Sequence, residues 1–509
     1  MMMYLKEMLL AGAIMMGLSA CSKDNDTITW QPEERERFLL YHEPTKGWVG
    51  DVMPYYINGR FEIFYLNDAT DVEKQSSTGQ HPIFKLSTDN LVDVTDDGEV
   101  IPYGTANTQD HLIGTGSMIQ VGDTYYFYYT GHNGSASWLQ NNNTGWVSPN
   151  NREAVMYATS SDMVNWTKQT DFILKAPSGY ARNDFRDPYV FYNEEFGEYW
   201  MLVSTQQNGR GVLLLYTSDN PGNNDWKLDG PLTIPDHDYL MLECADIFKV
   251  GDKYYLLFGE DWTGTPGTHY RVATSTRGPW LKPESGRDML DGHQFYAGKT
   301  ASDGSNRYAF AWAHRRNPEN DNGARTWAGN LITHEIYALS NGELAVRIPE
   351  AFSSKINTAS EWSVVNKEGT VNESNNGLVL ADAASATLNE LGGTNRITAT
   401  LSLGSAESLS LFFGTGESTG STYEIRFEKN NNRIAGYNLG NEVTRVPFDF
   451  SGDDSYDITL VVDGSIVVVY VNDQVALTNR SYGLQHKNWR LTAHGGQVSL
   501  TNFSTFKAE

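Results

Sequence analysis

The chain is 509 residues long, which is enough for two domains, one of them large. Its aromatic content of 12% and its excess of Gly (47) over Pro (17) favour many short strands joined by tight turns, and therefore an all-β protein. The formal net charge of −25 argues against a nucleic-acid-binding protein, because a phosphate-binding surface has to be basic.

The first twenty residues have the layout of a secretory signal peptide. Lys6 precedes an apolar stretch, Met8–Leu18, that is too short for a stable membrane span. Leu18-Ser19-Ala20-Cys21 resembles a bacterial lipobox, in which the chain is cut before the cysteine and the cysteine is acylated. We therefore expect a lipoprotein signal peptide over residues 1–20 and a lipidated Cys21. A plain secretory signal that is cut nearby is the alternative.

Residues 21–36 are expected to form the acylated N-terminus and a tether. The polar, acidic run Ser22–Asp26 is similar to the segment that follows the cysteine in surface lipoproteins of the Bacteroidetes. This predicts a protein anchored in the bacterial outer membrane, periplasmic or on the cell surface, which meets the membrane only through its lipid. Only Cys244 remains once Cys21 is acylated, so we expect no disulfide within the chain.

One structural unit recurs five times along the next three hundred residues. It is an apolar strand, a turn that contains Gly, and a strand rich in aromatic residues. The copies are Tyr55–Tyr65, Met118–Tyr129, Val190–Val203, Ile247–Phe258 and, more weakly, Ala301–Trp312. A further strand that ends before a Trp follows copies two, three and four, at Met156–Asp162, Leu215–Asp219 and Val272–Ser275.

Repeats spaced roughly sixty residues apart, with at least three strands each, fit the blades of a β-propeller, which bury their faces by stacking around an axis. We expect a five-bladed β-propeller over residues 37–349; a β-sandwich with similar hairpins is the alternative. Residues 350–509 lose Trp, gain Ser, Asn and Gly, and alternate between apolar and polar residues. This pattern predicts a separate C-terminal β-sandwich.

Three acidic residues lie at matching points of the repeats. Eight residues separate Asp51 from Gly59, and eight separate Glu243 from Gly251. Asp187 lies ten residues before its turn glycine because that turn is longer. Since the first strand of each blade lines the central channel, the three carboxylates are expected to meet at one end of it.

Carboxylates that lie close together resist simultaneous ionisation, so one pKa should be raised and that group can act as an acid near neutral pH. Such a set suits glycosidic bond cleavage, in which one carboxyl protonates the leaving oxygen and another attacks the anomeric carbon or activates water. The same cluster could instead bind a cation such as calcium. Taken one at a time, each acid is more often a turn or an ion-pair residue.

The order of the motifs resembles glycoside hydrolase family 32, the β-fructofuranosidase, inulinase and levanase group, with related furanosidases in families 43 and 68. Gly47–Asp51 resembles the family's Trp-Met-Asn-Asp-Pro-Asn-Gly segment, and Gly114–Ser117 its Ser-Gly-Ser segment. Phe185–Pro188 matches Phe-Arg-Asp-Pro, and Glu243–Asp246 matches Glu-Cys-Pro-Asp. Three later segments are similar too: Gln294–Ala297, Trp327–Asn330 and Val462–Asp473.

The resemblance implies a retaining furanosidase that needs neither metal nor other cofactor. It assigns Asp51 as the nucleophile, Glu243 as the acid/base, and Asp187, with Arg186, as the group that holds the sugar and stabilises the transition state. The substrate would be an oligo- or polysaccharide of fructan or sucrose type. Further candidates for binding the sugar are Thr115, Ser117, Trp48, Tyr296 and Trp262. The three aromatic residues could equally pack between blades.

The nucleophile segment departs from the family pattern. Gly50 stands where the family has Asn, Val52–Pro54 replaces Pro-Asn-Gly, and Leu66 replaces a Gln of the first hairpin. These changes remove amide donors from positions that contact the fructosyl unit in the family. Two other functions therefore stay open: an arabinan- or xylan-type glycosidase on the same propeller, and a surface lipoprotein that binds glycans without cleaving them.

Overall fold

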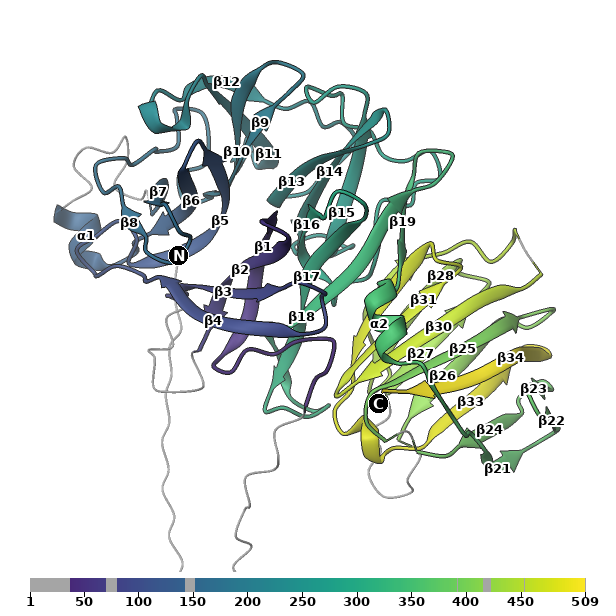
Figure 1. Cartoon of the computed structure of the whole chain (residues 1–509). Coiled ribbons are helices and arrows are strands. Elements are labelled where there is room, and N and C mark those ends of the chain that lie inside the picture. Colours follow the sequence, from purple (N-terminus) through teal and green to yellow (C-terminus); the bar gives the residue numbers. More distant parts are fainter. Residues whose placement is uncertain are drawn as a thin grey trace, which may run out of the picture. The chain divides into compact units, whose positions relative to one another are not determined.

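The computed structural model describes residues 37–69, 80–141, 152–390, 392–414, 423–452 and 454–508. The expected signal peptide, Cys21 and the tether lie outside these residues. Among the described residues, neither of the two helices, α1 (Ala136–Asn141) and α2 (Glu350–Lys355), has the length and apolar character of a membrane span. Nearly all other regular structure is strand, which confirms the prediction of an all-β protein (Figure 1).

The first nineteen strands form four antiparallel sheets, of which one contains both the first and the last hairpin repeat. In that sheet β1 pairs with β18 through Val49 and Gly329. Its strands, in spatial order, are β16 (Tyr296–Ser302), β17 (Arg307–Asn317), β18 (Ala324–Ala338), β1 (Trp48–Ile57), β2 (Arg60–Asp68), β3 (Ile83–Thr88) and β4 (Val94–Ile101), with β19 (Leu344–Arg347) beside β18.

The other three of these sheets each hold one hairpin repeat and the strand that was expected to follow it. The second repeat lies in β5 (Leu112–Val121), β6 (Thr124–His132), β7 (Glu153–Ser160) and β8 (Thr167–Lys168). The third lies in β9 (Phe185–Asn193), β10 (Glu198–Gln207), β11 (Arg210–Ser218) and β12 (Lys227–Pro231). The fourth lies in β13 (Glu243–Val250), β14 (Lys253–Glu260) and β15 (Gly267–Ala273).

The first strands of the five hairpins follow one another in a closed ring. Strand β1 contacts β5 and β16, β9 contacts β5 and β13, and β13 contacts β16 (Figure 1). The five hairpins predicted from the sequence are therefore present, and their first strands face one another. The number of propeller blades and the domain limits, 37–349 and 350–509, stay predictions.

Two further sheets enclose one hydrophobic core, as expected of a β-sandwich. The first is β22 (Val371–Ser374), β23 (Gly377–Leu380), β34 (Val498–Lys507), β25 (Asn395–Ser402), β30 (Tyr456–Asp463), β31 (Ile466–Val471) and β32 (Val475–Arg480), with β20 (Thr358–Ser360) beside β34. The second is β21 (Val364–Glu368), β24 (Ser385–Leu388), β33 (Trp489–His494), β26 (Ser408–Phe413), β27 (Tyr423–Glu428), β28 (Arg433–Asn438) and β29 (Asn441–Pro447).

Polar contacts join these two sheets to the strands before them, so that Arg37–Glu509 is one compact unit. The buried carboxylate of Asp291 accepts hydrogen bonds from the backbone N–H of Thr478, at 2.7 Å, and from the ring of His334, at 2.9 Å. The Arg480 side chain donates to the carbonyl oxygen of His314 at 2.8 Å. Buried charged groups are stable only when they are hydrogen-bonded, and these groups are.

Candidate active site

Irregularities in strand pairing shape the site. The pairing of each first strand with its neighbour shifts near the same point, at residues 49–52, 114–116, 186–189, 243–246 and 296–299. A β-bulge of this kind turns a side chain away from the alternation of its strand and is common beside active sites. Asp51 and Asp187 lie within two of these bulges, and Glu243 begins a third.

The strand pairing shows that the three acids do not all lie at equivalent positions, although their distances to the turn glycines suggested that they did. Asp51 and Asp187 both lie six residues before the last paired residue of their hairpin, whereas Glu243 lies seven before it. Gly59 is the second residue of its two-residue turn and Gly251 is the first, so equal distances to the glycines hid a shift of one residue. Cys244, not Glu243, is the structural equivalent of the two aspartates.

Cys244 shares its backbone conformation with Asp187. Its φ of 54° matches the 57° of Asp187, and both values are unusual for residues other than Gly. The backbone N–H of Cys244 donates to the Asp187 carboxylate at 3.1 Å, and its thiol lies 3.7 Å from the Thr115 hydroxyl. Cys244 thus connects the surroundings of Asp187 to those of Asp51, while its side chain stays buried and unpaired with any other cysteine of the described residues.

Both oxygens of the Asp51 carboxylate accept hydrogen bonds. The Thr115 hydroxyl donates to Oδ2 at 2.6 Å, and the indole Nε1 of Trp312 donates to Oδ1 at 2.9 Å. Donors on both oxygens fix the orientation of this carboxylate. Thr115 is only 1% exposed, so it serves as a positioning residue for Asp51, and direct sugar binding by Thr115 stays a prediction.

Asp187 is buried beside Arg186, and burial raises its pKa to about 7, helped by the nearby charge of Asp51 and opposed by the Arg186 guanidinium. The backbone N–H of Asp187 donates to the Thr130 hydroxyl at 2.9 Å, which fixes the bulge. Arg186 also reaches toward Glu243, with 3.6 Å between Nε and Oε1, and pairs with Glu153 at 3.3 Å.

Burial also raises the pKa of Glu243, to about 8, against the lowering effect of the Arg186 guanidinium. The charges of Asp187 and Asp51 add to the rise, so the three carboxylates act on one another as expected. The sequence predicted one raised pKa caused by like charges, whereas two are raised and burial is the larger cause. The raised pKa favours the protonated form of Glu243, which is the form that a general acid needs.

Tyr296 was expected to bind sugar, and its hydroxyl donates to Oε2 of Glu243 at 2.9 Å. This hydrogen bond stabilises the ionised carboxylate and lowers the Glu243 pKa. We expect Tyr296→Phe to move the alkaline limb of the kcat/KM profile upward by roughly half to one pH unit, because Glu243 then keeps its proton longer. A pH profile of kcat/KM measures this, with Tyr56→Phe as the control; an unmoved limb in Tyr296→Phe would contradict the role.

The other expected sugar-binding residues differ in exposure. Ser117 is fully buried, donates to the carbonyl oxygen of Pro188 at 2.8 Å, and accepts from the Val190 N–H at 2.7 Å, so it ties β5 to β9. Trp48 is 7% exposed, and the guanidinium carbon of Arg315 lies 3.6 Å from the centroid of the Trp48 ring.

Trp262, by contrast, is 46% exposed in the segment after β14, where a ring could stack on a sugar. All three residues, Ser117, Trp48 and Trp262, were expected to bind sugar. Their roles in binding stay predictions, and for Ser117 and Trp48 packing accounts for the contacts that are seen.

A cluster of aromatic rings that the sequence did not predict lies beside Asp51. The Trp312 ring lies 5.6 Å from the Tyr296 ring and 5.6 Å from the Trp327 ring, centroid to centroid, and Trp327 lies 4.3 Å from His81. Trp327 belongs to a segment that the family resemblance singled out, but nothing local in the sequence connects Trp312 or His81 to Asp51. The pairing of β16 with β17 places Tyr296 opposite Trp312, and the pairing of β1 with β18 brings these strands beside the strand of Asp51.

Trp327 also explains the glycine before Asp51. A Cβ on residue 50 would lie 2.1 Å from Cη2 of Trp327 and 2.8 Å from the carbonyl oxygen of Leu66. The indole therefore fills the space that an Asn side chain would need. Of the remaining departures, Val52, Met53 and Leu66 are buried in hydrophobic cores, so they serve packing.

We expect Gly50→Asn to destabilise the fold by about 1–3 kcal/mol, because the new side chain must displace Trp327. Trp327→Ala should relieve the clash, so the double variant should be more stable than the sum of the two single changes allows. Urea unfolding of the four proteins of this double-mutant cycle measures the coupling. Strict additivity would mean that Trp327 does not occupy the space.

Within the part of the chain that the structure describes, no three His, Cys, Asp or Glu side chains form a group that could hold a metal ion. The carboxylates of the site instead accept hydrogen bonds from N–H and O–H donors, and one of them pairs with the Arg186 guanidinium. The site therefore combines Asp51, whose two oxygens accept hydrogen bonds, with Glu243, whose pKa is raised. A displacement at an anomeric carbon uses one carboxylate as the nucleophile and one carboxylic acid as the proton donor.

The model for the glycosyl hydrolases family 32 N-terminal domain matches residues 42–345, and the model described as GH32, BT1760-like, C-terminal domain matches residues 342–504. The chain belongs to glycoside hydrolase family 32. Two Escherichia coli relatives, sucrose-6-phosphate hydrolase and raffinose invertase, are each 27% identical to it, over 60% and 61% of this chain. The matches span 62% and 63% of these relatives, less than two thirds of either protein.

Solved structures of family 32 share the fold over most of both chains. A Bombyx mori GH32 beta-fructofuranosidase has a TM-score of 0.68 at 20% identity and covers 93% of this chain and 94% of its own. The exo-inulinase of Aspergillus awamori has a TM-score of 0.71 at 18% identity and covers 94% and 99%. At this level of identity the likeness establishes the family 32 fold and leaves the substrate to be argued separately.

Proposed function

We propose that the protein is a retaining glycoside hydrolase that cleaves furanosidic bonds of sucrose or fructan type, on a five-bladed β-propeller. The observation that carries the proposal is the difference between the surroundings of the two carboxylates: both oxygens of Asp51 accept hydrogen bonds, whereas burial raises the pKa of Glu243. The ring of contacts between the five first strands supports the propeller. The names of the family 32 relatives support a saccharide substrate.

In the first step, an Asp51 oxygen forms a bond to the anomeric carbon while the glycosidic C–O bond breaks and Glu243 gives its proton to the leaving oxygen. In the second step, Glu243 takes a proton from water, the water oxygen attacks the anomeric carbon, and Asp51 is released. Asp187 and Arg186 hold the sugar ring between them. The mechanism needs the Asp51 and Glu243 carboxyls to be roughly 5 to 5.5 Å apart.

Two experiments test this proposal. A product assay over sucrose, inulin, levan and arabinan identifies the bond that is cleaved; release of sugar from arabinan alone would favour the arabinan-type alternative. Proton NMR of the first-formed anomer separates the mechanisms, since a retaining enzyme releases product with the configuration of the substrate. Binding of a polysaccharide without any release of sugar would leave only a glycan-binding lipoprotein.

We further propose that Cys21 carries the lipid that anchors the protein in the outer membrane. The expectation rests on the lipobox-like Leu18–Cys21. Cys21→Ser should move the protein from the membrane fraction to the soluble fraction of the cell envelope, as seen by immunoblotting, because the acylated thiol is lost. Retention of Cys21→Ser in the membrane fraction would exclude this anchor. Cys244→Ser is the matched control and should stay with the membrane.

A further inference from the structure

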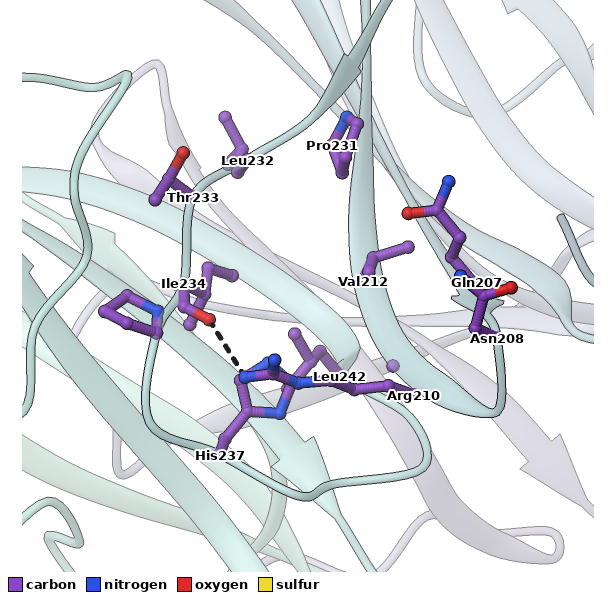
Figure 2. Close-up of a pocket in the computed structure, with 12 residues that line it drawn as sticks. Gln207, Asn208, Arg210, Val212, Pro231, Leu232, Thr233, Ile234, His237 and Leu242 are labelled. Atoms are coloured by element: carbon purple, nitrogen blue, oxygen red, sulfur yellow. Dashed lines mark hydrogen bonds between the residues drawn. The ribbon is translucent and has the colours of Figure 1, made fainter. Parts of the chain in front are cut away.

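A cavity of about 510 Å³ lies between the turn that joins β10 to β11 and the segment between β12 and β13 (Figure 2). Its volume is in the range of small-molecule sites. One wall is formed by Gln207–Val212 and the other by residues 231–237, with Leu242 behind them. None of the three carboxylates of the candidate active site lines it.

The two walls are fixed to each other by hydrogen bonds. The Gly211 N–H donates to the carbonyl oxygen of Tyr239 at 2.8 Å, and the Leu232 N–H donates to that of Leu213 at 2.9 Å. A Cβ on residue 211 would lie 2.9 Å from the Met241 backbone, so only Gly lets the chains approach this closely. The cavity is therefore preformed, which lowers the entropy cost of filling it.

The polar groups that face the cavity have few partners of their own. Nδ1 of His237 is buried and has no hydrogen-bond partner among the described residues. Arg210 makes one long hydrogen bond, 3.5 Å to the carbonyl oxygen of Ile234, and forms no ion pair with any described residue. Figure 2 shows the His237 ring beside the Arg210 guanidinium, with Gln207 and Asn208 to one side.

This surface suits a neutral ligand that carries hydroxyls. Burial lowers the His237 pKa to about 4, helped by the charges of Arg210 and Arg271, so the imidazole is neutral near pH 7. The Arg210 guanidinium offers several donors in one plane, and the amides of Gln207 and Asn208 both donate and accept. Pro231, Leu232 and Ile234 supply the apolar surface on which a sugar ring can lie.

Both walls of the cavity lie at the ends of their strands that are nearest the candidate active site. Leu242 immediately precedes Glu243, and its carbonyl oxygen accepts a hydrogen bond of 2.6 Å from the Ser204 hydroxyl. Ser204 in turn pairs with Arg186 across β9 and β10. The cavity is thus joined directly to the two strands that carry Glu243 and Arg186.

We propose that this cavity binds sugar units of the leaving-group part of a saccharide chain, beyond the two units that share the cleaved bond. The inference rests on the proposed function, in that it takes Glu243 as the acid. It adds that the substrate is longer than a disaccharide, since the cavity would hold sugar units beyond the two that share the cleaved bond. Arg210 and His237 would then determine the preference for chain length, whereas the three carboxylates determine the bond.

Calorimetric titration of sucrose and of linear fructo-oligosaccharides of increasing length tests the proposal. The full chain with Glu243→Gln is used, so that binding is measured without turnover. Affinity should rise with length, and adding Arg210→Ala and His237→Ala should weaken binding of the longest oligosaccharide about tenfold while leaving sucrose unchanged. Thr233→Trp, which fills the cavity, should have the same effect; Lys227→Ala, an exposed cation of β12 outside the cavity, should have none.

The subsite would be overturned by an affinity that does not depend on chain length, or by equal losses of affinity for sucrose and for long oligosaccharides. It would also be overturned if inorganic phosphate displaced the bound sugar. If no fructo-oligosaccharide binds, the same titrations with arabino-oligosaccharides decide, and a lack of length dependence there excludes the subsite. If the product assay shows no hydrolysis, the proposed function is rejected but the subsite is not, because the titrations need no turnover.

Discussion

Asp51→Asn should reduce kcat by about 10⁴-fold or more, because an amide cannot form the covalent intermediate that divides the displacement into two steps. The variant should still fold, since Asn keeps the size of the side chain and one acceptor for Thr115 or Trp312. Initial rates on the substrate found by the product assay, together with a thermal unfolding curve, measure both effects.

The matched control is Asp123→Asn, an aspartate in the exposed turn between β5 and β6. It should leave kcat and the unfolding temperature unchanged, because it changes the same chemical group far from the candidate site. Activity of Asp51→Asn within tenfold of the unaltered protein would reject Asp51 as the nucleophile. A large drop in its unfolding temperature would instead assign Asp51 a structural role.

Glu243→Gln should lower kcat by about 10²- to 10⁴-fold, because glutamine cannot protonate the leaving oxygen. The loss should depend on the leaving group. A substrate whose leaving group departs without protonation should keep most of its rate in the first step, whereas a sugar leaving group should lose it. Equal losses with both substrates would contradict the role of Glu243 as the acid.

The same substitution should stabilise the fold. A carboxyl whose pKa rises on folding binds more protons in the folded state, so its contribution to stability falls as the pH rises from the usual pKa of a glutamate toward about 8. Glutamine removes this cost, which we expect to be of the order of 2 kcal/mol at pH 7. Unfolding curves of both proteins between pH 5 and pH 8 should diverge as the pH rises; parallel curves would exclude the effect.

Repetition in the sequence accounts for how much of the fold could be predicted. A hairpin with a glycine turn and an aromatic second strand is a local pattern, so all five copies, and the alternating strands after residue 350, could be located without a structure. What the pattern could not provide was register. Gly251 opens its turn whereas Gly59 closes its own, and this difference moved Glu243 by one residue relative to Asp51 and Asp187.

By itself the sequence determined the all-β class, the hairpins and the residues that carry the family 32 motifs, because each is encoded by neighbouring residues. Only the tertiary structure decided the environments of the carboxylates. Trp312 contacts Asp51 across 261 positions of the chain, and Trp327 fills the space beside Gly50 through the pairing of β1 with β18. Burial, not sequence spacing, raises the pKa of Glu243, since burial depends on everything that packs around the side chain.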